Sequence, residues 1–429
     1  MSALPDIRLP RAALLIALCL VACAARAAGW PTIRTIDFAG NDVTRPETMQ
    51  RELLVHVGDP ADPAAIERSR QAVQDLGLFK SVEVESRPVD GGVRLLFRVH
   101  EKWYILPVPR VQGNSNGEYG YGGQLRWNNL WGLNHTLNVQ ATKLKLHDPD
   151  KTGQTNAQAS YSLPFLDDTH YGVSGSLGYI SQDSLNPQGQ PYKETFENAQ
   201  VVASYAFASE HPSKGWSVAG GLSWQRDSTS GPFAPPSPGE ALGPVVYVTY
   251  DDLRYLIYSE EGQRFRAASQ FSIDGLGSSY TASNYYFSYR RDWHVGDTPH
   301  QTVEFLGNTG VYLGGAPGHI HNFYSLGGAR ALRGYSSSFA EGDSGYYFAG
   351  AYLRPVHWDW LRLLVIAEAG TVYPEFGQTG GRPLYASIGV GLRLRINWLV
   401  NVEVEAGAAV PLVGGSGVRP FAGSVDANR

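Results

Sequence analysis

The chain has 429 residues, a formal net charge of −5 and a pI near 6.1. This length allows two domains, and the acidic balance gives no electrostatic case for nucleic-acid binding. Both cysteines, Cys19 and Cys23, lie close to the N-terminus. Disulfides and thiol catalysis are therefore excluded from the rest of the chain.

Residues 1–27 are predicted to be a secretion signal. Arg8 and Arg11 precede the apolar run AALLIALCLVACA, and Ala25-Arg26-Ala27 offers a small-residue cleavage site. The run LVAC at 20–23 also fits lipid attachment at Cys23, so the type of signal peptidase stays open. No later segment is apolar for long enough to predict a transmembrane helix.

Residues 31–102 predict a small α+β domain of the order strand, helix, helix, strand, strand. Thr44 and Glu47 have the spacing of a capping box, which predicts a short first helix. Asp62-Pro63 predicts the start of a second helix, which Gly77 ends. The sequence VDGG then predicts a hairpin between the last two strands. Pattern alone defines only a generic small domain.

Residues 103–429 alternate with period two, which predicts half-buried strands. In ASIGVGLRLRI, for example, one face is apolar and the other carries Ser387, Arg393 and Arg395. A soluble β-sandwich would alternate too, but these strands are longer than the usual five or six residues. They reach the roughly 9–11 residues of a tilted membrane strand, and aromatic residues gather near their ends, as in interfacial girdles. In lipid such a sheet must close on itself.

We therefore expect an all-β transmembrane barrel of about 16 antiparallel strands after the small α+β domain. The predicted strands are 104–112, 119–128, 134–146, 155–163, 171–182, 196–207, 215–226, 244–253, 264–274, 281–293, 300–312, 346–356, 361–373, 384–396, 400–411 and 417–425. Long connections are expected outside at 183–195, 227–243, 313–345 and 374–383. One longer connection, 254–263, falls on the inner side.

No catalytic constellation is present in the sequence, so we expect a protein that is not an enzyme and uses no cofactor. His319 and His321 lack a third ligand and predict no metal site. The acidic pairs Asp251-Asp252 and Glu260-Glu261 are interpreted as solvated turn residues. Four charged residues on the polar faces of the last strands are expected to face the lumen: Arg393, Arg395, Glu403 and Glu405.

Three stretches resemble known families. The run from GNDVT through LLVHVGDPAD and LGLFKSVEVE to VRLLFRVHEK resembles a POTRA domain, which implies client capture by pairing at a sheet edge. YDDLRYLIYSEEGQRFR and GGARALRGYSSSF resemble segments of the BamA/TamA-like superfamily of outer-membrane assembly and translocation proteins, also called the bacterial surface antigen family. This resemblance runs in order from about residue 31 to 425.

The resemblance implies that the loop 313–345 folds back into the lumen, where Leu332, Arg333, Gly334 and Tyr335 form its signature. Arg333 is then expected to pair with Glu368, in the segment AEAG that ends at Gly370. Lysine would serve less well, because it lacks the bidentate fork of arginine. The sequence also departs from the family: Ala351 stands about where a Glu is usual, and the usual terminal aromatic is absent, Phe421 being the nearest.

The first hypothesis for function is a factor that inserts or translocates proteins at the outer membrane, with the POTRA-like domain in the periplasm. Pro107 and Pro109 would weaken the seam between the first and last strands. Its partners would be outer-membrane lipids, unfolded outer-membrane or exported clients and periplasmic chaperones. The alternative is a passive pore, lined by the four charged lumen residues. A carrier displaying a fused passenger is a third, but the chain contains no passenger domain.

Overall fold

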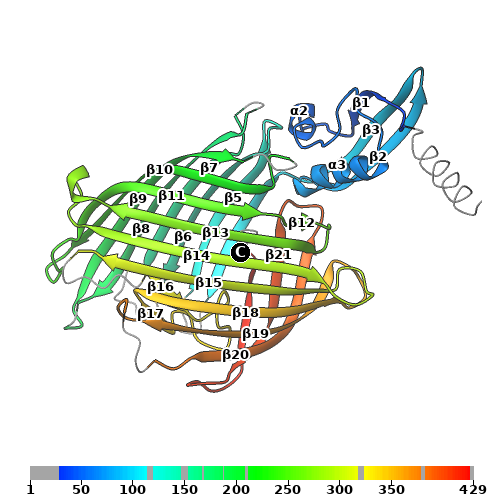
Figure 1. The fold of residues 1–429 in the computed structure, drawn as a ribbon. Helices are drawn as coiled ribbons and strands as arrows, with labels where there is room; N and C mark the ends of the chain where they lie inside the picture. Colours follow the sequence, from blue (N-terminus) through cyan, green and yellow to red (C-terminus); the bar gives the residue numbers. More distant parts are fainter. Residues whose placement is uncertain are drawn as a thin grey trace, which may run out of the picture.

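The computed structural model describes residues 29–113, 119–145, 153–166, 169–186, 188–207, 211–316, 323–377 and 382–425. A small domain lies against one end of a large barrel (Figure 1). The predicted signal, with Cys19 and Cys23, falls outside the described residues. In the described part, no helix is long and apolar enough to cross a membrane.

The small domain is a three-stranded sheet covered by helices. Its elements are β1 (Ile33–Ala39), α2 (Pro46–Gln50), α3 (Pro63–Asp75), β2 (Phe79–Val89) and β3 (Gly92–Glu101), with sheet order β1-β3-β2 and β1 parallel to β3. The side chain of Asp62 caps α3, accepting from the main-chain N of Ala64 at 3.1 Å, as predicted. The apolar core includes Met49, Val73 and Phe97, all fully buried.

The predicted capping box is wrong. The N-cap of α2 is Arg45, which makes no side-chain cap. Thr44 instead donates from its main-chain N to the carboxylate of Glu101 at 2.7 Å, and its hydroxyl donates to the same oxygen at 2.5 Å. Asn129 of the barrel also donates to the Thr44 hydroxyl, at 2.8 Å. A tertiary carboxylate thus replaces the local cap.

Sixteen long antiparallel strands form a closed barrel, which also includes the two-residue strand β12 (Arg254–Tyr255). The order follows the chain, and β22 returns to lie beside β4. The long strands are β4 (Ile105–Gly113), β5 (Tyr119–Leu130), β6 (His135–Lys145), β7 (Gln154–Leu163), β8 (Tyr171–Leu185), β9 (Pro191–Ala206), β10 (Gly215–Ser230), β11 (Gly239–Asp251), β13 (Glu260–Ser272), β14 (Ala282–His294), β15 (Thr302–Gly314), β18 (Ser344–Pro355), β19 (Leu361–Tyr373), β20 (Tyr385–Ile396), β21 (Val402–Pro411) and β22 (Arg419–Ser424).

The predicted strands all exist, but two outer connections are shorter than expected. β8 runs to Leu185 and β9 begins at Pro191, while β10 extends to Ser230 and β11 begins at Gly239. The polar residues that suggested loops at 183–195 and 227–243 continue the ladder beyond the apolar belt. A strand that extends beyond the hydrocarbon layer no longer needs an apolar face. Its alternation of apolar and polar residues therefore ends, while its hydrogen bonds to the neighbouring strands continue.

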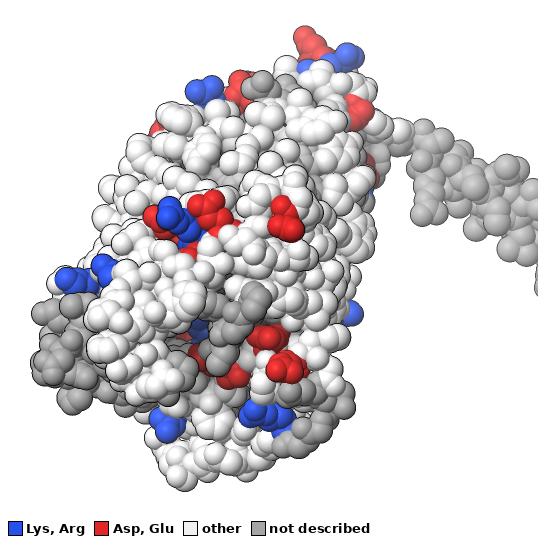
Figure 2. Space-filling model, turned by 90° about the vertical axis from the view of Figure 1, so that its left-hand side faces the viewer, with Lys and Arg blue, Asp and Glu red and all other residues white. Residues whose placement is uncertain are grey.

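Exposure along the strands is reversed relative to a soluble protein. In β20 the apolar Ile388, Val390 and Leu392 are 47%, 58% and 45% exposed, whereas Arg393 is 2% exposed. The outward apolar face suits lipid, and the charged face turns into the barrel. Seen from its loop end, the outline of the barrel is mostly uncharged (Figure 2).

Candidate functional site

Between β15 and β18 the chain folds back against the inner wall of the barrel. β16 (Tyr324–Leu326) and β17 (Ala340–Gly342) pair antiparallel and frame the signature segment 332–335. Leu332 and Arg333 are 0% and 1% exposed. His319 and His321 lie outside the described residues, and no group of metal-ligating side chains occurs in the described part of the chain.

Arg333 is bonded to carboxylates on two strands. Its Nη1 lies 2.5 Å from Glu368 Oε1 on β19, as the sequence predicted, and its main-chain N donates to Glu368 Oε2 at 2.8 Å. Its Nε donates to Glu405 Oε1 on β21 at 3.0 Å, and Nη2 contacts the same oxygen. Tyr347 and Ser387 donate to Glu368 at 2.6 and 2.9 Å. The guanidinium and the Glu368 carboxylate are thereby satisfied while buried.

The other signature residues fit the wall sterically. A Cβ at Gly334 would lie 2.7 Å from backbone atoms of Val410 and Pro411, so only glycine allows this approach. The Tyr335 hydroxyl contacts the main-chain carbonyls of Ala386, at 2.9 Å, and Val413, at 2.5 Å. Leu332 has a positive φ of 54°, a rare conformation for a branched residue that the packed surroundings hold in place.

Gly370 and Phe421 also lie next to the loop. A Cβ at Gly370 would lie 3.0 Å from the Leu326 side chain, so this glycine makes room for β16. The Phe421 ring is buried, and the Arg333 guanidinium lies 5.3 Å from its centre. Phe421 therefore packs inside the barrel, and Ala351 is buried in the same cluster.

The four charged residues expected in the lumen extend this site into a continuous network. Arg393 bridges Glu304 (2.7 Å) and Glu405 (3.3 Å), and Arg395 bridges Glu260 (3.3 Å) and Glu403 (3.1 Å). Arg362 donates to Glu403 at 2.9 Å. All four predicted residues are at most 9% exposed. They face inward as predicted, but they are ion-paired and buried rather than arranged along an open channel.

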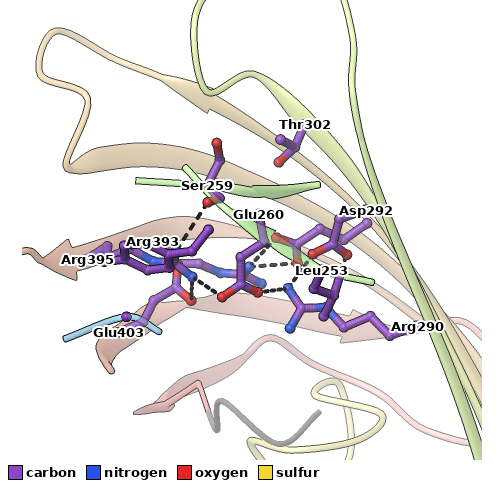
Figure 3. A network of polar contacts seen from close by, with 12 residues as sticks. Leu253, Ser259, Glu260, Arg290, Asp292, Thr302, Arg393, Arg395 and Glu403 are labelled. Atoms are coloured by element: carbon purple, nitrogen blue, oxygen red, sulfur yellow. Dashed lines mark hydrogen bonds and ion pairs between the residues drawn. The ribbon is translucent and has the colours of Figure 1, made fainter. Parts of the chain in front are cut away.

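From Arg395 the network continues to Glu260 and Arg290 (Figure 3). There Arg290 bonds Glu260 at 2.7 Å and contacts Asp292. The interpretation of Glu260 and Asp251 as solvated turn residues is wrong. Glu260 is paired with Arg290, and Asp251 lies 2.7 Å from Arg264. Sequence reasoning missed Glu304, Arg290 and Arg362, although each has the inward parity of its strand.

The seam between β4 and β22 is the second candidate site. The Tyr104 carbonyl accepts from Asn128 of β5 at 2.8 Å, while the Trp103 main-chain N donates to Trp398, on the opposite side, at 2.9 Å. Since successive backbone groups of a strand alternate in direction, odd-numbered residues of β4 direct their backbone groups toward β22. Pro107 and Pro109 therefore remove two donors on the β22 side. β22 itself pairs with β21 over only six residues.

The small domain is attached to the barrel rim by buried polar contacts. The Glu52 carboxylate is fully buried and bonds Ser213 at 2.6 Å and the His211 ring at 3.0 Å. Burial raises the pKa of Glu52, but the bonds from His211 and Ser213 outweigh it and leave this pKa below its usual value. Asp75 accepts from the Tyr255 main-chain N at 2.7 Å. Burial raises the pKa of Asp75 despite the nearby Lys214.

Lys102 lies at the centre of this attachment. Its Nζ donates to Gly77 O at 2.9 Å and to the Tyr255 hydroxyl at 2.7 Å. Burial lowers the pKa of Lys102 to about 7, and Arg395 adds to this effect. Since Lys102 of the small domain bonds Tyr255 and lies close enough to Arg395 to be affected by its charge, the charge network of the lumen reaches the small domain.

Comparisons with known proteins agree with this architecture. Residues 31–102 match the POTRA family, described as surface antigen variable number repeat. Over 116 residues the chain is 29% identical to the outer membrane protein assembly factor BamA of Neorickettsia risticii, covering 27% of this chain and 16% of that relative's length.

Three solved structures share the fold across 92% of this chain. BamA from Haemophilus ducreyi lacking POTRA domains 1–3 has a TM-score of 0.53 at 16% identity, over 85% of its chain. CdiB from Acinetobacter baumannii and from Escherichia coli have TM-scores of 0.58 and 0.61 at 14% and 15% identity, over 73% and 75% of their chains.

The described residues therefore form a closed β-barrel that carries a luminal loop and is preceded by a POTRA domain. Over most of its length the chain is thus similar in fold to BamA and CdiB, and its residues 31–102 match the POTRA family. 

Proposed function

We propose that this protein inserts or translocates other proteins at the outer membrane. The POTRA domain captures an extended client segment, and the client is then handled at the β4–β22 seam or in the lumen. The partners are unfolded outer-membrane or exported proteins, the surrounding lipids and periplasmic chaperones.

Client capture is supported by the free side of β2, an edge strand that pairs only with β3. The main-chain carbonyl of Val82 accepts from Arg70 Nη1 at 3.2 Å and so points away from β3. Because backbone groups alternate in direction along a strand, the even-numbered residues of β2 direct their N–H and C=O groups toward the free edge. Val84 and Ser86 therefore direct their backbone groups away from the sheet. An extended client can pair there through main-chain hydrogen bonds, without specific side chains.

The observation that carries the proposal is the proline pair at the seam. At this junction β4 lacks two main-chain donors toward β22, at Pro107 and Pro109. In the membrane, the carbonyls opposite those prolines lose partners that lipid cannot replace. A seam that lacks these donors is easier to open, and an opened edge can pair with an incoming strand.

The passive pore is the second candidate function, and the lumen argues against it. The signature loop is bonded to β19 and β21, and the charged residues that would line a channel neutralise one another in pairs. A pore needs a polar inner wall that is open to water. Here the buried ion pairs of Arg333 instead hold the signature loop against that wall.

A reversible disulfide across the seam tests the proposal. Both native cysteines lie in the predicted signal, so an introduced pair meets no other cysteine in the barrel. Cysteine pairs are placed at lipid-facing positions that keep both prolines, Ile105 on β4 with Ala422 or Ser424 on β22. A deletion strain is complemented with locked variants, with or without reductant, and its outer-membrane and secreted proteomes are quantified. Loss of defined barrels indicates insertion, and loss of exported proteins indicates translocation.

The single-cysteine variants serve as controls. Restoration by reductant is the result expected for a working seam. If locking changes neither proteome while Arg333→Ala changes both, the client passes through the lumen. If neither variant changes a proteome but solute uptake changes, the protein is a pore.

A further inference from the structure

A cavity of about 550 Å³ lies between α3 of the POTRA domain and the outer wall of the barrel. Its barrel side is formed by Phe207, Trp216 and Tyr250, and its POTRA side includes Leu54, Glu67 and Arg68. This volume is within the roughly 300–1,000 Å³ range of small-molecule sites. Figure 1 shows α3 beside the end of the barrel that carries the POTRA domain.

The floor of the cavity belongs to the lipid-facing surface. Trp216 and Phe207 are 49% and 47% exposed, and the Trp216 ring lies 5.1 Å from that of Tyr250. Further along the same face of β10, Val218 and Leu222 are exposed to the membrane side. These aromatic rings therefore stand at the periplasmic margin of the apolar belt, where headgroups lie.

The remaining walls carry both signs of charge. Arg68 and Arg254 are exposed cationic groups, and Glu67 and Asp252 are exposed carboxylates on the same cavity. Glu67 also bonds Arg70 at 2.8 Å, Arg254 bonds Glu261 at 3.0 Å, and the lining residues Lys214 and Asp75 form a further ion pair at 3.6 Å. Arginine binds phosphate oxygens through its planar fork, while carboxylates and aromatic faces bind an ammonium group. A balanced set of this kind suits a zwitterion better than a simple anion.

We propose that this cavity binds the headgroup of a zwitterionic glycerophospholipid from the periplasmic leaflet, such as phosphatidylethanolamine. The phosphate lies by Arg68 and Arg254, the ammonium lies by Glu67 and Asp252, and the acyl chains follow the face of β10 below Trp216. The bound lipid then joins the POTRA domain to the barrel wall. This inference rests on the outer-membrane location and is independent of the proposed function.

Native mass spectrometry of the full chain tests the site. The protein is delipidated in detergent and titrated with phosphatidylethanolamine. Wild type is expected to retain one lipid, and the double variant Arg68→Glu/Arg254→Glu is expected to bind at least tenfold more weakly. Arg87→Glu is the control. Like Arg254, which lies 3.0 Å from Glu261, Arg87 is an exposed arginine beside a carboxylate, Glu85 at 2.6 Å, but it does not line the cavity. Equal retention by wild type and the double variant would overturn the proposal.

Two further arms cover misfolding and other ligands. Trp216→Ala, which leaves every charge in place, is expected to weaken binding, with Trp398→Ala, another exposed tryptophan, as its control. Water-soluble glycerophosphoethanolamine is expected to bind much more weakly than the lipid, and equal binding would contradict a lipid site. A photoreactive residue at Leu54 is expected to crosslink to phospholipid in cells, and a protein adduct instead would identify the cavity as a client site.

Discussion

Arg333 Nε donates to Glu405 Oε1 at 3.0 Å across 72 residues of sequence. Together with the contact to Glu368, this bond holds the loop arginine between β19 and β21, on either side of β20. Position 351 of β18 is an alanine and supplies no carboxylate, so the second negative charge beside Arg333 comes from Glu405 on β21. The loop is therefore positioned by two strands at once.

Replacing Arg333 with alanine is expected to destabilise the barrel by about 3–5 kcal/mol, because two buried carboxylates lose their partner. Arg333→Lys should recover only part of this, since lysine cannot bond both carboxylates with a planar fork. The measurement is the temperature at which the folded, fast-migrating band disappears on electrophoresis. Arg354→Ala, at an exposed arginine of β18, is the control. Equal midpoints for the two alanine variants would refute the luminal role of Arg333.

The sequence predicted the strands, and it predicted which charged residues face the lumen. Side chains alternate between the two faces of a strand, so the face of each residue follows from its position in the strand. It did not predict which charges pair. Arg393 and Glu405 are cross-strand neighbours, but Arg393 also bonds Glu304 across the lumen, and that depends on barrel curvature. The contacts of Glu52 and Lys102 with the barrel were missed for a similar reason, since both depend on how two domains dock.

Gly334→Ala is expected to displace the loop, because its Cβ would meet backbone atoms of β21 at 2.7 Å. Backbone cannot yield as a flexible side chain does, so the loop must withdraw from the wall. Single-channel conductance in planar bilayers is expected to rise and become noisier than in wild type. Gly350→Ala, where a Cβ meets nothing within 4 Å, should behave as wild type. Unchanged conductance in Gly334→Ala would mean that the loop does not obstruct the lumen.

Docking of the POTRA domain is expected to strengthen as the pH rises above 7. Burial of Lys102 lowers its pKa from 10.5 to about 7 in the docked state, so the undocked state binds more protons between these values. Stability of docking therefore increases with pH in that window and is flat below it. Energy transfer between dyes at Lys80→Cys and Asp359→Cys reports docking. Lys102→Met should abolish the rise between pH 7 and 9, and a rise that persists would assign it to another group.

Ser86→Pro is expected to impair client capture while leaving the POTRA domain folded. Ser86 directs its backbone N–H outward, so proline removes a donor from the free edge and none from the ladder with β3. Arg87→Pro is the contrasting variant. Arg87 is paired with Arg94 of β3, so proline there removes a hydrogen bond of the β2–β3 ladder and is expected to destabilise the domain. Protease resistance of the full chain distinguishes unfolding of the POTRA domain from loss of a donor at its free edge. Ser86→Pro should stay resistant yet fail to restore the outer-membrane or secreted proteome of a deletion strain, whereas full complementation would show that clients do not pair along this edge of β2.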